Sequence, residues 1–345
     1  MMRSAVWTRC AKWSVAMFVV TLLVATMGCE RRPLLDPSHT TEVQVTVDLD
    51  GLHNVTCDIY NDKITAPTVP SEMLRVLFYE PGTNRIAGES YISNLSTDSE
   101  GRRVVSGRVG ILPGEYEMVV YNFDITSTLI RNDHSHSTIE AYSSPVSEAL
   151  ASRFNTRVDS RDEIRYQPDH VIVATDPNLV IPWHDDLHII RTTATSVVES
   201  YYLQVKVDGL QWVSSAQAIV TGMAGSNFLG SRNRVDVPET AIYFTLEKSD
   251  DNGEAVLCSV FNTFGRIDTE NELWISFDIN TVDGRTESRE FEISHLFESD
   301  AGRNHHWLLL DEKITIDKPT TPPTAGGGFA PELEDWTEEN HEIIL

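Results

Sequence analysis

The stretch EVQVTVDL, residues 42–49, alternates apolar and polar side chains along its whole length. An extended chain would place the apolar residues on one face, namely Val43, Val45, Val47 and Leu49. A repeat of two residues is the repeat of a β-strand with one buried face. The stretch therefore predicts a strand that lies against a core.

The same alternation recurs far along the chain, in LQVKV (203–207), AIYFTLE (241–247) and LWISFDI (273–279). Other segments that fit strands are LRVLFYE, RRVVSGRVGIL, EYEMVVYNF, HVIVAT, AQAIVTGM, VLCSVFNTF, EFEISHLF and HWLLLDEKITI. Pairs such as Pro81-Gly82, Pro113-Gly114 and Asp283-Gly284 favour tight reversals between them. Many short strands with such turns predict an all-β chain of antiparallel sandwiches.

Helical signals are few. Ser144 and Pro145 precede VSEALASRF, where they would supply a cap and a first-turn proline. We expect one short helix around residues 145–154, in an excursion between strands.

The N-terminal segment indicates where the protein resides. Basic residues in the first 13 positions are followed by an apolar run from Ser14 to Met27, which ends at Gly28 and Cys29. This is the layout of a secretion signal, and the run is short for a spanning helix. The end of the run resembles the lipobox of bacterial lipoproteins, although Thr26 and Met27 depart from its usual residues.

The lipobox resemblance implies cleavage of residues 1–28, between Gly28 and Cys29, and attachment of acyl chains such as palmitate to Cys29. These chains would hold the protein at a membrane without a spanning helix. The alternative is an ordinary secreted protein in which this cysteine is incidental. Residues 29–40 would form a tether in the lipoprotein.

The net charge and the cysteine content argue against two classes of protein, those that bind nucleic acid and those that are held together by disulfides. The net charge of −25 opposes nucleic-acid binding, since phosphates would be repelled. Beyond Cys29 only Cys57 and Cys258 remain, which is too few for a disulfide-stapled scaffold. The two could pair across the predicted domain boundary or stay free.

Two domains are the most natural division of a chain of this length. VQVTVDLDGL at 43–52 and LQVKVDGL at 203–210 both run from an alternating strand into Asp, Gly and Leu, so each could open one sandwich. Chance similarity of two strands remains an alternative. We predict an N-terminal domain at 41–191 and a C-terminal domain at 192–318.

The last segment, 319–345, differs in composition. PTTPPTAGGG is typical of an extended and then flexible linker, and an acidic stretch without Lys or Arg follows it. This tail could be disordered. Alternatively, it could dock as an added strand on an exposed sheet edge, through its apolar residues Phe329, Leu333, Trp336 and Ile343.

Few patterns point to chemistry. His184-Asp185-Asp186-Leu187-His188 is the best metal candidate, but neighbouring strands make a loop with ordinary histidines the preferred interpretation. Neither a nucleophile elbow nor a phosphate-binding glycine loop is present. We predict no catalytic residue, no metal and no cofactor, and hence no enzyme.

Tryptophans offer one binding hypothesis. Two or three of them could form a stacking platform for a glycan if they shared an exposed face; the candidates are Trp183, Trp212, Trp274 and Trp307. Tryptophans more often belong to cores.

Several segments together carry a family resemblance: CERRPL, YEPGTN, LPGEYEMVVYNFD, IVTGMAGSNFLGS and KPTTPPTAGGGF. They resemble a family of Bacteroidales-type lipoproteins that is related to fimbrial anchor and minor-subunit (fimbrillin-like) proteins. The resemblance covers most of the mature chain, and TGMAG at 221–225 is its most distinctive motif.

The resemblance implies two transthyretin-like β-sandwich domains in tandem, attachment to the outer membrane through the lipid, and a role in cell adhesion at the base or accessory positions of a fimbrium. In polymerising subunits of that kind, assembly looks like strand exchange. We therefore expect a non-enzymatic envelope lipoprotein that contacts fimbrial or other envelope subunits through its strand edges, on the periplasmic or cell-surface side. The alternative is a glycan-binding surface lipoprotein.

Overall fold

A computed structural model describes residues 40–49, 73–83, 85–122, 126–154, 163–183, 186–234, 237–267 and 272–319. The predicted signal peptide, Cys29 and Cys57 lie outside these residues, as do the tail positions 329, 333, 336 and 343. Within the described part of the chain, no helix combines the length and apolar character needed to cross a bilayer.

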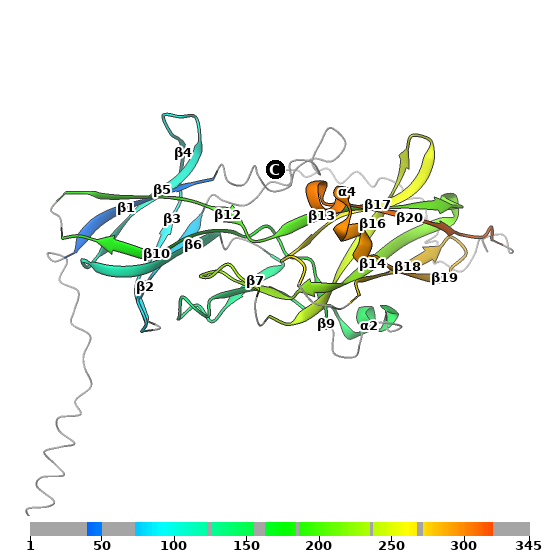
Figure 1. Cartoon of the computed structure of the whole chain (residues 1–345), viewed down its shortest axis with the longest axis horizontal. Helices are drawn as coiled ribbons and strands as arrows, with labels where there is room; N and C mark the ends of the chain where they lie inside the picture. Colours follow the sequence, from blue (N-terminus) through cyan, green and yellow to red (C-terminus); the bar gives the residue numbers. More distant parts are fainter. Residues whose placement is uncertain are drawn as a thin grey trace, which may run out of the picture. The chain divides into compact units, whose positions relative to one another are not determined.

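The first half of the described chain is a two-layer sandwich (Figure 1), which we call the first sandwich. One layer has the order β11-β1-β5-β4 and the other the order β12-β10-β6-β2-β3. The strands are β1 (Thr41–Asp48), β2 (Leu74–Glu80), β3 (Arg85–Ile92), β4 (Asn94–Thr97), β5 (Arg103–Ile111), β6 (Gly114–Asn122), β10 (Ile172–Ile181), β11 (His188–Thr193) and β12 (Thr195–Ser196).

The alternation in EVQVTVDL produces this core. Val43, Val45 and Val47 are fully buried, and they share one apolar cluster with Val76 of β2 and Met118 of β6 in the opposite layer. The predicted strand at 42–49 is confirmed, because β1 spans Thr41–Asp48 with these valines facing inward.

The second half forms the second sandwich, in the strand order β19-β18-β14-β16-β17-β13-β20. Its layers are joined by β16, whose residues up to Leu246 pair with β14 and whose residues from Glu247 pair with β17. The strands are β13 (Glu199–Asp208), β14 (Val213–Ala224), β16 (Glu239–Asp251), β17 (Glu254–Thr263), β18 (Trp274–Thr281), β19 (Thr286–Glu292) and β20 (Trp307–Thr315).

The two strands of the sequence echo occupy equivalent positions. β1 pairs in parallel with β11 and antiparallel with β5. β13 likewise pairs in parallel with β20 and antiparallel with β17. Each strand thus opens a sandwich and pairs with its last long strand, so β11 and β20 are equivalent. β10 corresponds in the same way to β19, because the two-residue strand β12 covers the edge of β10 only at Ile172 and Val173.

A small separate sheet joins the two sandwiches. Strands β7 (Thr128–Arg131), β8 (Glu140–Ser143) and β15 (Ser226–Phe228) form a small sheet in the order β15-β8-β7, so that it draws on both halves of the chain. Residues from both halves also share one apolar cluster, which includes Tyr79 and Tyr121 from the first sandwich and Leu229 and Phe264 from the second half. β9 (Glu163–Tyr166) adds to this connection by pairing in parallel with β16.

The helices are short. The predicted helix is present as α2 (Glu148–Ala151) and the 3-10 helix η3 (Ser152–Phe154), but its cap is Ser147 rather than Ser144. Pro145 instead forms a β-bridge with Arg165. A further 3-10 helix, η4 (Leu210–Trp212), follows β13.

The prediction of a strand across EFEISHLF was wrong in its second half. β19 ends at Glu292, and α3 (Ser294–Glu298) and α4 (Asp300–His305) follow. The Glu292 carboxylate accepts a hydrogen bond from the Ser294 backbone N–H, and this contact helps to begin the helix. Leu296 and Phe297 of α3 are buried, so these apolar residues contribute to the core from a helix rather than from a strand.

The all-β fold of sandwiches is confirmed. The division near residue 192 stays a prediction. β11 runs through this position, and β12 returns to pair with β10 before β13 begins.

Candidate functional site

The free edges of the sandwiches are the candidate site, because an edge strand presents unpaired backbone donors and acceptors to another chain. Each sandwich has one side where the edges of its two layers meet, and we call this side a seam. The seam of the first sandwich lies between β10 and β11. The seam of the second lies between β19 and β20.

Charged side chains of Arg285 and of β19 span the seam of the second sandwich. Glu287 and Arg289 lie opposite Ile279 and Phe277 of β18, and these two apolar residues belong to the core. Residues directly opposite each other in a sheet share a face. Glu287 and Arg289 therefore lie on the inner face of their layer, where a closed sandwich would normally place apolar side chains.

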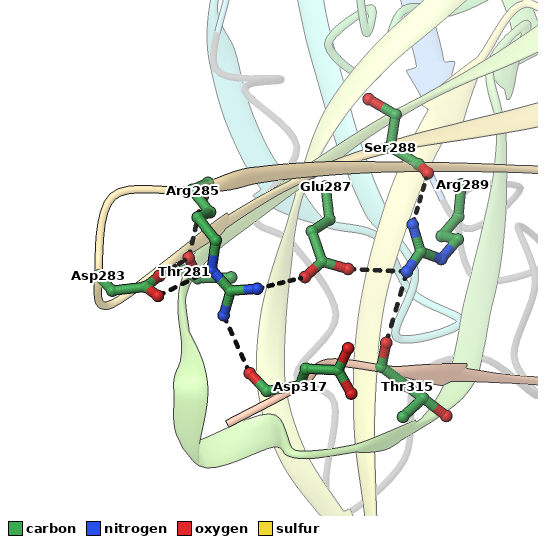
Figure 2. Close-up of polar contacts among 8 residues, drawn as sticks. All are labelled: Thr281, Asp283, Arg285, Glu287, Ser288, Arg289, Thr315 and Asp317. Atoms are coloured by element: carbon green, nitrogen blue, oxygen red, sulfur yellow. Dashed lines mark hydrogen bonds and ion pairs between the residues drawn. The ribbon is translucent and has the colours of Figure 1, made fainter. Parts of the chain in front are cut away.

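These charges bridge the two layers, as Figure 2 shows. Arg285 donates from Nη2 to the backbone carbonyl of Asp317 at 3.0 Å, and Arg289 donates from Nη2 to the carbonyl of Thr315 at 3.5 Å. Glu287 lies between them, with its carboxylate 3.4 Å from Arg285 Nη1 and 2.7 Å from Arg289 Nη2. We call Arg285, Glu287 and Arg289 the charged clamp.

The turn before β19 supports the charged clamp. Asp283 accepts a hydrogen bond from the Thr281 hydroxyl and lies 2.7 Å from Nε of Arg285. These contacts, with that of Thr281 the largest, lower the pKa of Asp283. The carboxylate thus stays charged and fixes the orientation of Arg285.

The seam of the first sandwich is apolar. Leu179 and Ile181 of β10 and Ile190 of β11 are buried in the common core. Among the described residues of these two strands, no ion pair joins β10 to β11. Ile189, the neighbour of Ile190, points outward and is 51% exposed.

The exposed edges differ in how they discourage pairing with another chain. β10 carries Pro177 within a bulge between Asp176 and Leu179, and both features disrupt an edge. β20 presents Asp311, Glu312 and Lys313, and β19 carries the charged clamp. β4 and β12 are very short. β3, the outer strand of the five-stranded layer, is bulged at Ala87. β11 has neither bulge nor proline, so it is the least protected long edge among the described strands of the two sandwiches.

The charged clamp was missed at the level of sequence, although a signal existed. In RTESREF, residues 285–291, the charged residues 285, 287 and 289 fall on the same face as Phe291, which packs against the core. Charged residues at every second position, on the same face as an aromatic residue, are the sequence pattern that indicates a charged inner face.

The other sequence candidates do not converge on a site. His184 and Asp185 lie outside the described residues, and within those described no group of three or more His, Cys, Asp or Glu side chains could hold a metal. Cys258 is a partly buried free thiol in the described chain, and burial is the largest cause that raises its pKa.

The tryptophan platform, which was the alternative to tryptophans in cores, does not form among the described tryptophans. Trp183 is exposed, whereas Trp212 packs on the second core and Trp274 and Trp307 are only partly exposed. Trp274 begins β18 and Trp307 begins β20, which lie in different layers. The structure thus does not gather exposed indoles on one face.

Comparison with known proteins gives three findings. The sequence profile of a family described as "Domain of unknown function (DUF5119)" matches residues 28–244. A Bacteroides ovatus protein with the provisional name fimbrium anchoring subunit Fim4B is 24% identical over 97% of this chain and 99% of its own length.

The third finding concerns the fold. A crystal structure of a Bacteroides ovatus protein, provisionally described as an adhesin, aligns with 86% of this chain and 99% of its own, at a TM-score of 0.59 and 22% identity. The two chains therefore share their fold over most of their length.

Proposed function

The chain belongs to the DUF5119 family, and from this premise we propose that it is a non-enzymatic subunit of a cell-envelope fimbrium, acting as an anchor or minor assembly subunit. The observation that carries the proposal is the similarity to a fimbrium anchoring subunit over nearly the full length of both chains. The all-β sandwich architecture supports it, since such sandwiches offer edges for strand addition.

The contact with other subunits forms through a strand edge, and β11 is the edge that the geometry favours. A strand added beside β11 would gain backbone hydrogen bonds in the layer β11-β1-β5-β4. Its alternate apolar side chains would lie beside Ile190 and Leu179 at the apolar seam. The equivalent edge in the second sandwich, β20, is instead faced by the charged clamp.

Membrane attachment belongs to the same proposal. Signal cleavage between Gly28 and Cys29 and acylation of Cys29 would hold the body at the outer membrane. The tail residues Phe329, Leu333, Trp336 and Ile343 are candidates for a strand that is donated to a partner or docked on this chain.

The test is affinity capture of the full chain from membranes of the organism that expresses it, with mass spectrometry of the co-purified proteins. We expect fimbrial subunits to co-purify, and we expect a Cys29→Ser variant to leave the membrane fraction because it lacks the acceptor for acyl chains. Consistent absence of fimbrial subunits from the captured material would refute the assembly role. Retention of the Cys29→Ser protein in the membrane would refute the lipid anchor.

A further inference from the structure

One end of the first sandwich combines the entry of the N-terminal chain with exposed apolar side chains. Thr41, the first residue of β1, pairs with Ile111 at the end of β5, and Ile181 at the end of β10 pairs with Gly114. The Thr41 hydroxyl also donates to the carbonyl of Pro182 at 2.9 Å. These contacts bring the start of β1, the β5–β6 turn and the end of β10 to the same end of the sandwich.

Three large apolar side chains at this end are exposed: Leu112 at 39%, Val180 at 59% and Trp183 at 53%. Leu112 lies in the β5–β6 turn, and Trp183 follows Pro182 directly. We call Leu112, Val180 and Trp183 the apolar rim. Tryptophan is the side chain best suited to a membrane–water interface, since its ring is apolar and its N–H can stay hydrated.

The length of chain before Thr41 limits how far this end can lie from a lipid anchor. Cys29 precedes Thr41 by twelve residues, which span at most about 40 Å when fully extended. The opposite end of the sandwich, at the turn that holds Glu100, is farther away by the length of β5, on the order of 30 Å. The apolar rim therefore lies at the end of the sandwich where the segment that follows Cys29 joins β1.

We propose that the apolar rim rests on the phospholipid surface and orients the protein on it, an inference that rests on the proposed acylation of Cys29. The acyl chains supply the attachment, while Trp183 and its neighbours insert shallowly among the headgroups. A zwitterionic surface fits best, because the chain carries a net charge of −25 and would be repelled by anionic lipid.

The experiment uses the lipidated full chain in vesicles of phosphatidylethanolamine and phosphatidylcholine. An environment-sensitive fluorophore is attached at Val180→Cys, in a background in which Cys57 and Cys258 are replaced by serine. The matched control carries the label at Glu100→Cys, which lies in the turn at the opposite end of the same sandwich. Lipids with a quencher near the headgroup report contact with the membrane, and vesicle flotation reports lipid anchoring separately.

We expect headgroup quenchers to reduce the fluorescence several-fold more at position 180 than at position 100. Leu112→Ser with Trp183→Ser should abolish this difference while flotation stays unchanged, because the acyl chains supply the attachment. A single cooperative melting transition of the variant checks that it still folds. Equal quenching at the two positions in protein that floats would overturn the inference.

Two other outcomes have distinct meanings. A change in the fluorescence at position 180 that depends on protein concentration and needs no vesicles would show that the rim binds a second copy, and would also overturn the inference. Protein that does not float contradicts the proposed anchor itself, so the two failures can be told apart.

Discussion

Glycine at position 222 shows how one residue allows a strand to serve two cores. It lies in TGMAG, where β14 is bulged between Val220 and Met223 and φ is +76°. Met223 belongs to the core of the second sandwich, while Ala224 belongs to the cluster that joins the two sandwiches. The distinctive motif of the sequence is thus the place where β14 passes between them.

Gly222→Ala should destabilise the protein by roughly 2–4 kcal/mol. A side chain at positive φ costs about 1–2 kcal/mol, and the added methyl would lie only 1.9 Å from the buried Leu273 side chain. Gly82→Ala is the matched control, since φ is +69° there and nothing lies within 4 Å of the added atom. Urea unfolding should show a clearly smaller loss for the control, and equal losses would contradict the packing argument.

The burial of His170 should make the folded protein less stable in weak acid. Burial lowers the pKa of His170, with a smaller opposing effect of Asp169, so the unfolded chain binds a proton at a higher pH than the folded one does. Stability should therefore fall as the pH drops below about 6.5, the ordinary histidine value. Denaturant midpoints measured between pH 7.5 and 5.5 should decline, and His170→Gln should reduce this slope. If the pH dependence of the denaturant midpoint is the same in His170→Gln as in the parent, other titratable groups cause the loss of stability.

At the scale of elements, the two seams contain equivalent strands but differ in their chemistry. The charged clamp at the second seam resembles the inward-pointing charges with which natural sheets prevent edge-to-edge association. Its loss should therefore expose the β19 and β20 edges to other copies of the chain.

Replacing Arg285, Glu287 and Arg289 together by threonine should increase self-association, detected as a larger mass by light scattering and as a rise in thioflavin fluorescence. Threonine suits strands, so β19 should persist. The control replaces Ser288 and Glu290 of the same strand, which point to the other face, and should leave the protein monodisperse. A clamp variant as monodisperse as the parent would show that the charges do not protect this seam.

Alternation and apolar runs in the sequence predicted most of the long strands and missed strands that depend on tertiary contacts. β2 and β6 were found because Leu74, Val76 and Met118 alternate or cluster within apolar runs. β9 and β11 were not predicted, since four or six residues give a weak period and each depends on a distant partner, β16 or β1. The sequence predicted a binding site at a sheet edge but not which edge. The edge strands depend on the order of strands in each sheet, and that order is set by pairings between segments that are far apart in the sequence.

At the scale of the whole molecule, the apolar cluster shared by both sandwiches should make them unfold together. Tyr79 and Tyr121 of the first sandwich are covered by Leu229 and Phe264 of the second half, and all four are nearly fully buried. A fragment of residues 41–196 would expose this face to water and lose β15 from the small sheet.

We expect the 41–196 fragment to be insoluble or to bind hydrophobic dyes, whereas the chain 41–319 should unfold in one transition seen equally by circular dichroism and fluorescence. A fragment that folds with its own cooperative transition would instead show that the first sandwich is an independent domain.

Site-specific photocrosslinking at the two equivalent edge strands, in cells that make the fimbrium, can identify the assembly edge directly. A photoreactive residue replaces Ile189 of β11 in one variant and Leu309 of β20 in the other, both of which are exposed. We expect crosslinks from position 189 to a fimbrial subunit and few from position 309. Equal crosslinking at the two positions, or crosslinking from position 309 alone, would contradict the assignment of β11 as the assembly edge.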